Sequence, residues 1–396
     1  MARIGSNLDD VRRRNLSAVL ERVHLSGGLS RAELTAATGL NRSTVAALVA
    51  DLAERRLVVE GGPGATRRVG RPSLTVAPHP APLAIAVNPE IDAIGIGVVG
   101  LGARVVHRVR RALGAIPGPE EAAAIIAAEI AALPASVTGG ARLVGVGLAV
   151  PGLVRASDGV VRWAPHLDWT DVPFTALVAR ATGLRAVAAN DAACAALAEH
   201  LFGAGRGADD IVYLNGGASG IGGSVIAGGR ALGGSGGYAG EFGHNRPGVH
   251  DPDDRRTPLG ELEQEVSRAR LVEVLGVEPG DERALTDAAL ATADPVALGE
   301  LGRQRRILST ALANAVNVLD PELIVLGGFL ATLLETDRGD LRAQIAAQAI
   351  PAAVEGMRIE PAALGSDRLL IGAAQRVFAA LIADPTGADP GGAVLG

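Results

Sequence analysis

The sequence lacks several features that mark particular classes of protein. It has one cysteine, Cys194, in 396 residues, which excludes an internal disulfide and a zinc site built from several thiolates. No run of about 18 uncharged apolar residues occurs outside Gly/Ala-rich amphipathic stretches, so no membrane span is predicted. The opening residues, MARIGSNLDDVRRR, contain no apolar segment typical of a secretion signal. A cytoplasmic protein is therefore expected.

Lysine is also absent, and every strongly basic side chain is arginine. Hydrophobic residues make up 48% of the chain and charged residues 20%, a balance typical of soluble globular proteins. The net charge of −6 is unevenly distributed, because residues 1–80 contain 12 arginines against 7 acidic residues. A basic N-terminal module on an acidic protein indicates an anionic partner for that module.

The first part of the basic module has the pattern of a helix-turn-helix. Apolar residues at helical spacing predict a helix over Val11–Val23. Ser30 and Glu33 have the spacing of a capping box, which predicts a second helix over Arg31–Thr38. Gly39 permits a tight turn, and a third helix is predicted over Asn41–Arg56. Two short helices joined through a glycine turn are typical of DNA-binding proteins.

Two short predicted strands, Leu57–Glu60 and Pro72–Ala77, flank an arginine-rich loop that we interpret as a wing. Short polar side chains and arginine at a helix N-terminus can reach base edges and phosphates, and arginines on a loop can enter a minor groove. The alternative is a helical packing module with a solvated loop. The predicted contacts to operator DNA are Arg31, Asn41, Arg42, Ser43, Thr44, Arg67, Arg68 and Arg71.

Strands and helices alternate in the rest of the chain, beyond a linker marked by Pro78, Pro80 and Pro82. This alternation predicts an α/β fold with largely buried sheets. The tail, residues 384–396, is predicted to be disordered. A helix is predicted over 120–133, a second helix follows the strand 185–191 and ends at 202, and a final strand and helix lie between 358 and 383. Predicted strands cover 83–87, 93–100, 104–111, 143–152, 185–191, 210–216, 221–229 and 323–328.

An ordered set of motifs carries a resemblance to a known family. LAVPG, AANDAACAALAE, SGIGGSVIAGG, GGSGGYAGEFGH and LGGFL, preceded by the helix-turn-helix and GRP, resemble the ROK family of repressors and sugar kinases. The N-terminal module is similar to that of the repressor branch, which includes the xylose-operon and N-acetylglucosamine-operon regulators. The resemblance implies an actin-like, sugar-kinase-like fold of two lobes with a sugar between them. The implied domains are 1–80, 81–190 completed by a helix around 368–383, and 191–367.

The resemblance also implies a set of sugar-binding residues. Sugar hydroxyls both donate and accept hydrogen bonds, so carboxylates, an amide and an imidazole can satisfy them together. The alternative is that these side chains only cap helices or face solvent; Asp191 in particular could cap the helix that follows it. The implied sugar contacts are Asn190, Asp191, Glu241, His244 and Glu263.

The family's zinc site is expected to be missing. It joins the histidine of the GH pair to three cysteines, and the three matching positions here are Asp254, Arg256 and Glu261. None is a thiol, so no structural zinc is predicted, and the sugar itself is expected to order residues 244–262. The alternative is a rebuilt metal site formed by His244, His250, Asp251 and Asp254.

The phosphate-binding segment departs from that of the family's kinases. The kinases carry DxGGTxx after the first strand, whereas this chain has NPEID over Asn88–Asp92, which replaces glycines and adds negative charge. Asp191 matches the kinases' catalytic base, yet phosphoryl transfer depends mainly on positioning and charge neutralisation. A second glycine segment, residues 216–223, remains, but glycines can serve the fold alone. We therefore predict no catalysis and no cofactor.

The leading hypothesis is a repressor that binds a palindromic operator as a homodimer or homotetramer and responds to a sugar. An ATP-dependent hexose kinase with an added DNA-binding domain is one alternative, and a repressor controlled by a protein partner is another. His166, where the family often has asparagine, either alters ligand choice or is simply exposed. Cys194 is expected to pack as a small hydrophobic residue.

Overall fold

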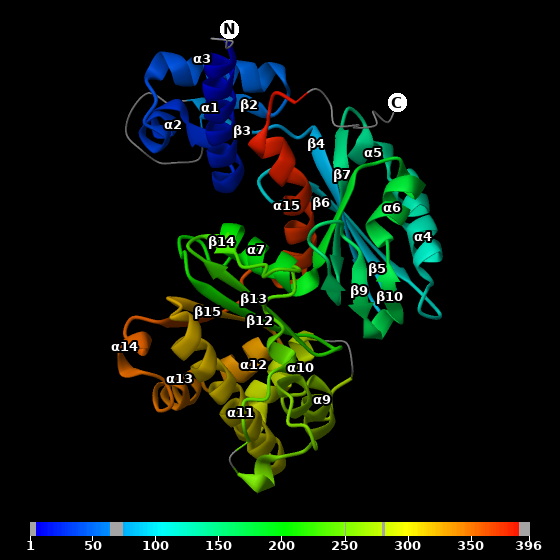
Figure 1. The fold of residues 1–396 in the computed structure, drawn as a ribbon, viewed down its shortest axis with the longest axis vertical. Coiled ribbons are helices and arrows are strands. Elements are labelled where there is room, and N and C mark those ends of the chain that lie inside the picture. The colour runs from blue at the N-terminus through cyan, green and yellow to red at the C-terminus, as the bar shows by residue number, and fades with distance from the viewer. Residues whose placement is uncertain (1–4, 64–73, 250, 279–281, 388–396) are drawn as a thin grey trace. The chain divides into compact units, whose positions relative to one another are not determined.

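The computed structural model describes residues 5–63, 74–249, 251–278 and 282–387. The chain forms two compact units (Figure 1). Residues up to Asn190, together with those from Leu369 onward, form the first unit, and Asp191–Arg368 form the second. None of the helices in the described ranges is both long and apolar enough to cross a membrane.

The first unit begins with a winged helix-turn-helix domain. A complete capping box at Ser30 starts the second helix, as the sequence predicts, and the Asn41 side chain caps the third, which begins one residue later than predicted. The strand order is β1-β3-β2. The wing tip, with the predicted DNA contacts Arg67, Arg68 and Arg71, lies outside the described residues. The elements are α1 (Gly5–Ser26), β1 (Leu29–Ser30), α2 (Arg31–Thr38), α3 (Arg42–Glu54), β2 (Val58–Pro63) and β3 (Leu74–Pro78).

The predicted linker is only three residues long. Pro78 ends β3 and Pro82 begins the next strand, so the connection consists of residues 79–81. The amide of His79 donates to the carbonyl of Leu57 at 3.0 Å, which fastens this connection to the winged helix-turn-helix domain. Pro78 and Pro82 lie at strand ends, where the missing N–H is tolerated.

A five-stranded sheet forms the centre of the first unit, in the order β11-β7-β4-β5-β6. The β4–β5 and β5–β6 pairs are antiparallel, whereas β4–β7 and β7–β11 are parallel. A small sheet of order β10-β9-β8 adjoins it. The strands are β4 (Pro82–Pro89), β5 (Ala93–Gly100), β6 (Arg104–Ala112), β7 (Arg142–Val150), β8 (Leu153–Val154), β9 (Val161–Ala164), β10 (Trp169–Val172) and β11 (Ala186–Asn190).

Helices cover both faces of this sheet (Figure 1). The C-terminal helix packs so closely that glycine is needed beneath it: a Cβ on Gly147 would overlap the carbonyl of Ala373, and one on Gly97 would lie 2.8 Å from Leu370. The last helix is thereby fixed to the first unit although it follows the second in sequence. The helices are α4 (Pro119–Ala131), α5 (Ala135–Thr138), η1 (Pro165–Leu167), α6 (Phe174–Thr182) and α15 (Arg368–Ala383).

The second unit has a sheet with the order β14-β13-β12-β15-β16. Its elements are α7 (Asp191–Phe202), β12 (Ile211–Gly216), β13 (Ile221–Ala227), β14 (Arg230–Ala231), η2 (Phe242–His244), η3 (Pro252–Asp254), α8 (Leu262–Glu265), α9 (Arg268–Leu275), α10 (Glu282–Ala291), α11 (Pro295–Leu319), β15 (Leu323–Gly328), α12 (Phe329–Thr336), α13 (Arg338–Ala346), α14 (Pro351–Val354), β16 (Arg358–Pro361) and η4 (Gly365–Asp367).

The two sheets share one topology. In each unit the first strand pairs antiparallel with the second, and the fourth and fifth strands add in parallel on the other side of the first. Each sheet has its own buried apolar cluster. The chain thus consists of two α/β units with a repeated topology, preceded by a winged helix-turn-helix domain.

A buried histidine joins the winged helix-turn-helix domain to the rest of the first unit. His24 in α1 is 1% exposed. Its Nε2 donates to Oε1 of Gln375 at 2.7 Å, and its Nδ1 accepts from the amide of Gly102 at 2.9 Å, a tautomer assigned from these partners. Burial lowers the pKa of His24 to about 4, and the hydrogen bond to Gln375 opposes that shift. Protonation of Nδ1 would remove the bond to Gly102.

We expect acid to weaken this junction. Because the folded pKa of His24, about 4, lies below its ordinary value of 6.5, its contribution is fully present above that ordinary pKa and is lost as the pH falls toward about 4. The loss amounts to about 3 kcal/mol. Between neutral pH and about pH 4, the free energy of unfolding in urea should fall by that amount more in wild type than in His24→Gln. Parallel pH profiles of the two proteins would contradict this origin.

Candidate functional site

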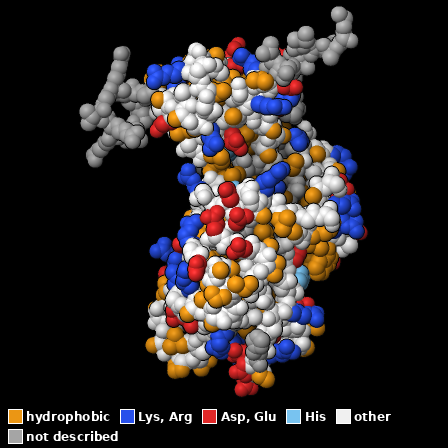
Figure 2. Space-filling model, turned by 60° about the vertical axis from the view of Figure 1, so that its left-hand side comes forward, with side chains coloured by type: hydrophobic (Ala, Val, Ile, Leu, Met, Phe, Trp, Pro, Cys, Tyr) orange, Lys and Arg blue, Asp and Glu red, His pale blue; other side chains and the backbone are white. Residues whose placement is uncertain are grey.

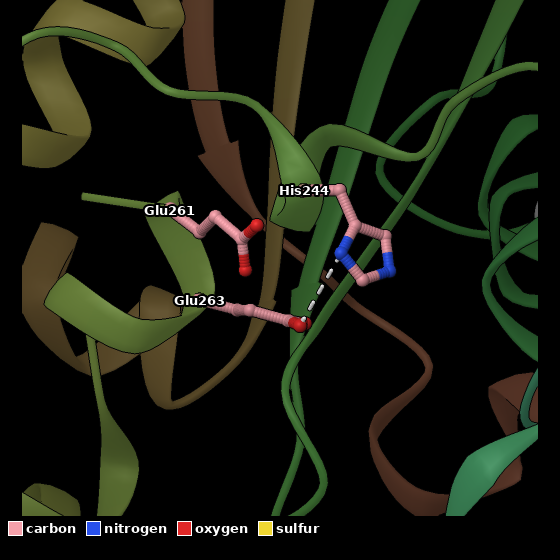
Figure 3. Close-up of side chains that lie close together, drawn as sticks. All are labelled: His244, Glu261 and Glu263. Carbon is pink, nitrogen blue, oxygen red and sulfur yellow. Dashed lines mark ion pairs between the residues drawn. The ribbon is translucent and has the colours of Figure 1, made fainter. Parts of the chain in front are cut away.

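Polar side chains from separate segments of the second unit meet near the start of β13. Glu241 directly precedes η2, which ends with His244, and Glu263 lies in the first turn of α8. Nδ1 of His244 lies 3.7 Å from Oε1 of Glu263 (Figure 3). The His244 side chain is 45% exposed and that of Glu263 is 24% exposed, so the pair remains open to a ligand.

Glycines make room for the Glu263 carboxylate. A Cβ on Gly220 would lie 2.4 Å from Oε2 of Glu263, and one on Gly243 would lie 2.8 Å from the same atom. Gly220 also has a φ of 144°, which disfavours any other residue. The amide of Ile221 donates to Oε2 of Glu263 at 3.3 Å. The predicted glycine segment therefore has a packing role beside the polar cluster.

Asp191 adds a third carboxylate. It is the first residue of α7, and its Oδ1 accepts from the amide of Ala192 at 2.7 Å. Burial raises the pKa of Asp191 to about 6; the charge of Glu241 adds to this shift, and Arg368 opposes it. Asp191 thus lies within electrostatic reach of Glu241.

Burial likewise raises the pKa of Glu241, with the charge of His244 opposing and that of Glu263 adding to the shift. The four residues Asp191, Glu241, His244 and Glu263 therefore form one electrostatically coupled group. Crowded carboxylates hold protons more tightly than isolated ones. Hydrogen-bond donors on a bound molecule would stabilise the ionised carboxylates, so the group suits a ligand rich in hydroxyls.

Asn190 behaves differently from the other predicted contacts. It is the last residue of β11 and belongs to the first unit. Its Nδ2 donates to the carbonyl of Gly152 at 3.0 Å, so its amide also supports the turn after β7. His166 is exposed, and Cys194 is completely buried in α7.

One group of side chains could hold a metal ion. One ligand atom from each of His244, Glu261 and Glu263 lies within 4.8 Å of the others (Figure 3). A histidine nitrogen with two carboxylate oxygens is a donor set compatible with a divalent ion such as zinc. Glu261 also lies 3.6 Å from Arg246 and accepts a hydrogen bond from Gln264.

The alternative metal set from the sequence receives no support from Asp254. Both carboxylate oxygens of Asp254 accept from Arg306, at 2.7 and 2.9 Å, and this pairing lowers the pKa of Asp254. His250 lies outside the described residues. The Asp254 carboxylate therefore serves a salt bridge, and His244 instead lies beside Glu261 and Glu263.

A buried ion pair supports the loop between η3 and α8. Glu265 is completely buried, and its carboxylate accepts from the amides of Arg256 and Thr257 and from the Thr257 hydroxyl. Arg303, 2% exposed, donates to Glu265 and to the carbonyl of Asp254. Burial raises the pKa of Glu265, but these hydrogen bonds and the charge of Arg303 outweigh it and leave the pKa lowered. The sugar was expected to order residues 244–262, but the Glu265–Arg303 pair already holds residues 254, 256 and 257 of this segment.

The predicted DNA contacts surround the start of α3. Asn41, Arg42 and Ser43 are exposed, and Oδ1 of Asn41 accepts from the amide of Thr44 and the hydroxyl of Ser43. The guanidinium of Arg31 instead makes two hydrogen bonds with Glu60. Basic side chains are visible on this domain near the grey residues in Figure 2.

The NPEID segment forms the end of β4 and the turn that leads to β5. Asn88 is buried and its Nδ2 donates to the carbonyl of Ala149 at 2.9 Å. Arg110 donates to Glu90 at 2.8 Å and to Asp92 at 2.9 Å. One arginine of the same sheet thus pairs with both acids of this turn and offsets only one of their two negative charges.

Comparison with known proteins defines the family. The model of the ROK family matches residues 86–379, so the chain belongs to the ROK family. A ROK family transcriptional regulator described as a homologue of the E. coli MLC protein has the same fold, with a TM-score of 0.75 at 23% identity over 94% of this chain and 97% of that one. A ROK glucokinase from Streptomyces griseus, in complex with glucose and AMPPNP, has a TM-score of 0.59 at 28% identity over 74% of this chain and 98% of its own.

Sequence relatives fall into two groups. A protein named putative xylose repressor from Caldicellulosiruptor sp. is 26% identical over 90% of this chain and 93% of its own length. The glucokinase of Thermotoga maritima is 30% identical over 70% of this chain and 92% of its own. The repressor match therefore extends over a larger part of this chain than the glucokinase match.

Sequence reasoning missed the residues that support the site. Glu265 and Arg303 lie 38 positions apart, and no local pattern connects them. A partial signal existed for Glu265, since a charged residue in an apolar context needs a buried partner. The partner itself is determined only by the packing of α11 against α8.

Removal of Arg303 should be far more costly than removal of Arg306, three residues along the same helix. Arg303→Met leaves the buried Glu265 unpaired and should cost about 3–5 kcal/mol. Arg306→Met breaks an ion pair whose arginine is 52% exposed, and should cost about 1 kcal/mol or less. Urea unfolding measures both, and hydrogen exchange at residues 256 and 257 should rise only in Arg303→Met. Equal losses in the two variants would refute the distinction.

Proposed function

We propose that this protein is a sugar-responsive DNA-binding transcriptional repressor of carbohydrate-metabolism genes. One observation carries the proposal: a winged helix-turn-helix domain precedes a ROK domain whose carboxylates and histidine form a coupled polar group. The repressor relative supports it, because its match covers 90% of this chain. The proposed location is the cytoplasm.

The proposed ligand is a sugar or sugar derivative. Asp191, Glu241, His244 and Glu263 would accept or donate hydrogen bonds to its hydroxyls, together with Asn190. A site of this kind selects among hydroxyl patterns, because an absent hydroxyl leaves a buried polar group unpaired. For regulation, the sugar must bind the DNA-competent and DNA-incompetent states with different affinities.

The proposed DNA contacts are those predicted from the sequence, with Arg42 foremost among the described residues. Arg42 is exposed at the first turn of α3, whereas Arg31 is engaged by Glu60. Insertion of α3 into a major groove by each subunit of a homodimer or homotetramer would suit a palindromic operator.

A hexose kinase is the second candidate, favoured by the Thermotoga maritima glucokinase match and by retention of Asp191. Against it stands the turn that carries NPEID. A turn with two carboxylates, both paired with Arg110, offers no attraction for the phosphates of ATP. We propose that the chain has no kinase activity and needs neither cofactor nor structural zinc.

The sugar site can be tested with Glu263→Gln, which retains shape but removes charge. Calorimetry against a panel of hexoses and pentoses should find a ligand whose affinity falls about tenfold or more in this variant. Glu273→Gln, an exposed position in α9, is the matched control and should bind normally. In a gel shift with the operator, the sugar should change wild-type affinity, and Glu263→Gln should need a correspondingly higher concentration.

Two results would count against this proposal. Operator affinity that no sugar alters would remove the sugar response. Release of ADP from ATP in the presence of a hexose, lost in Asp191→Asn, would establish the kinase instead. A response that persists unchanged in Glu263→Gln and Asp191→Asn would point to a protein effector.

The DNA contact can be tested with Arg42→Ala. A base contact by arginine contributes about 1–3 kcal/mol, so operator affinity should fall about tenfold or more. Arg22→Ala in α1 removes the same charge from an exposed position of the same domain and should have little effect. Fluorescence anisotropy at fixed salt measures both; equal losses would mean that only net charge matters.

A further inference from the structure

A groove of about 290 Å³ lies at the junction between the DNA-binding domain and the first ROK sheet. Arg56, just after α3, borders it on one side, and Arg104 and Val106 of β6 border it on another. The short connection contributes His79, and the segment from Ser136 to Ala141 contributes its backbone and a hydroxyl. The groove is therefore shared by both parts of the unit.

The groove is strongly cationic. Its lining includes two arginines and a histidine, and no aspartate or glutamate is among the described residues that form it. Nη2 of Arg56 donates to the carbonyl of Gly140 at 2.9 Å, which leaves the charge of the guanidinium uncompensated. Within the described ranges Arg104 forms no ion pair closer than 4 Å. Two like charges that line one groove repel each other, and a bound anion would relieve that repulsion.

Histidine adds a hydrogen-bond donor. Nδ1 of His79 accepts from the amide of Ala81 at 3.0 Å, so in the neutral ring Nε2 carries the proton. Burial lowers the pKa of His79, and the positive charge of Arg56 lowers it further. The electrostatic potential at His79 is thus positive, and a bound anion would lower it.

The groove is separated from the predicted DNA-reading residues. Those residues are at the N-terminus of α3, whereas Arg56 follows its C-terminus. Thirteen residues of helix span roughly 20 Å. A ligand here would contact the DNA-binding domain at the end remote from the operator, which favours a small anion over the DNA backbone as occupant.

We propose that this groove binds the phosphate group of a small anion, either free phosphate or a small phosphate monoester. Paired guanidinium groups are well suited to phosphate oxygens, and the volume is at the lower end of the range for small-molecule sites. By bridging Arg56 to Arg104, the anion fixes the DNA-binding domain against the first sheet. Any effect on operator binding rests on the proposed repressor function, but anion binding does not.

The test uses the full chain without DNA. Calorimetry with glycerol 3-phosphate and with inorganic phosphate, at constant ionic strength set by chloride, should show one saturable site per chain, while glycerol shows none. Tighter binding of the ester would identify a monoester site, and equal binding a site for free phosphate. Arg104→Met and Arg56→Met should each weaken binding about tenfold or more. Arg230→Met, an exposed arginine of β14, is the charge-matched control and should bind normally.

Two outcomes overturn the proposal. The first is a failure of the binding test: neither phosphate compound binds saturably, or Arg104→Met and Arg230→Met both bind as well as wild type. The other is a loss of operator affinity and of its salt dependence in Arg104→Met and Arg56→Met without any phosphate binding, which would assign the groove to the DNA backbone. Since Arg104 is exposed, its variant should unfold in urea as wild type does.

Discussion

The position of the candidate site depends on one buried ion pair, Glu265 with Arg303. A carboxylate without solvent contact remains ionised only when hydrogen-bond donors and a positive charge replace water. Two backbone amides, the Thr257 hydroxyl and the Arg303 guanidinium supply that replacement. Because Glu265 and Glu263 share the single turn of α8, the ion pair that fixes one also fixes the other.

Glycines also constrain the position of Glu263, because they leave the space that its carboxylate occupies. The Glu263 carboxylate occupies space that side chains at Gly220 and Gly243 would fill. Gly223 and Gly240 likewise approach so closely that a Cβ on either would lie 2.6–2.7 Å from the carbonyl oxygen of the other. A carboxylate, an imidazole and a second carboxylate can meet there because β13 and the segment before η2 are in backbone contact. The glycine-rich character of this region is thus a requirement of the site.

Features set by local sequence were predictable, whereas contacts between segments far apart in the chain were not. The capping box at Ser30 and the strands Ala93–Gly100 and Leu323–Gly328 were predicted at their observed bounds, because local hydrogen bonding and apolar runs determine them. The coupling of Asp191 to Glu241 was implied only by family resemblance, since it joins distant segments. The pairing of Arg31 with Glu60 and of Asp254 with Arg306 was not foreseen. Salt bridges across 29 or 52 positions leave no periodic trace in a sequence.

Because the topology is repeated, each unit has its own turn between its first and second strands, and the two turns can differ in chemistry. In each unit a turn joins the first and second strands: Glu90 to Asp92, at the end of the NPEID segment, in the first unit and Gly217 to Gly220 in the second. The second turn retains glycines, and one of them accommodates Glu263. The first contains no glycine between Asn88 and Asp92, and its acids bind Arg110. A turn whose two carboxylates share one arginine is compatible with the fold but keeps a net negative charge, which repels the phosphates of a nucleotide. A first turn that repels phosphate therefore need not disturb a polar site in the second unit, since the two turns lie in different sheets.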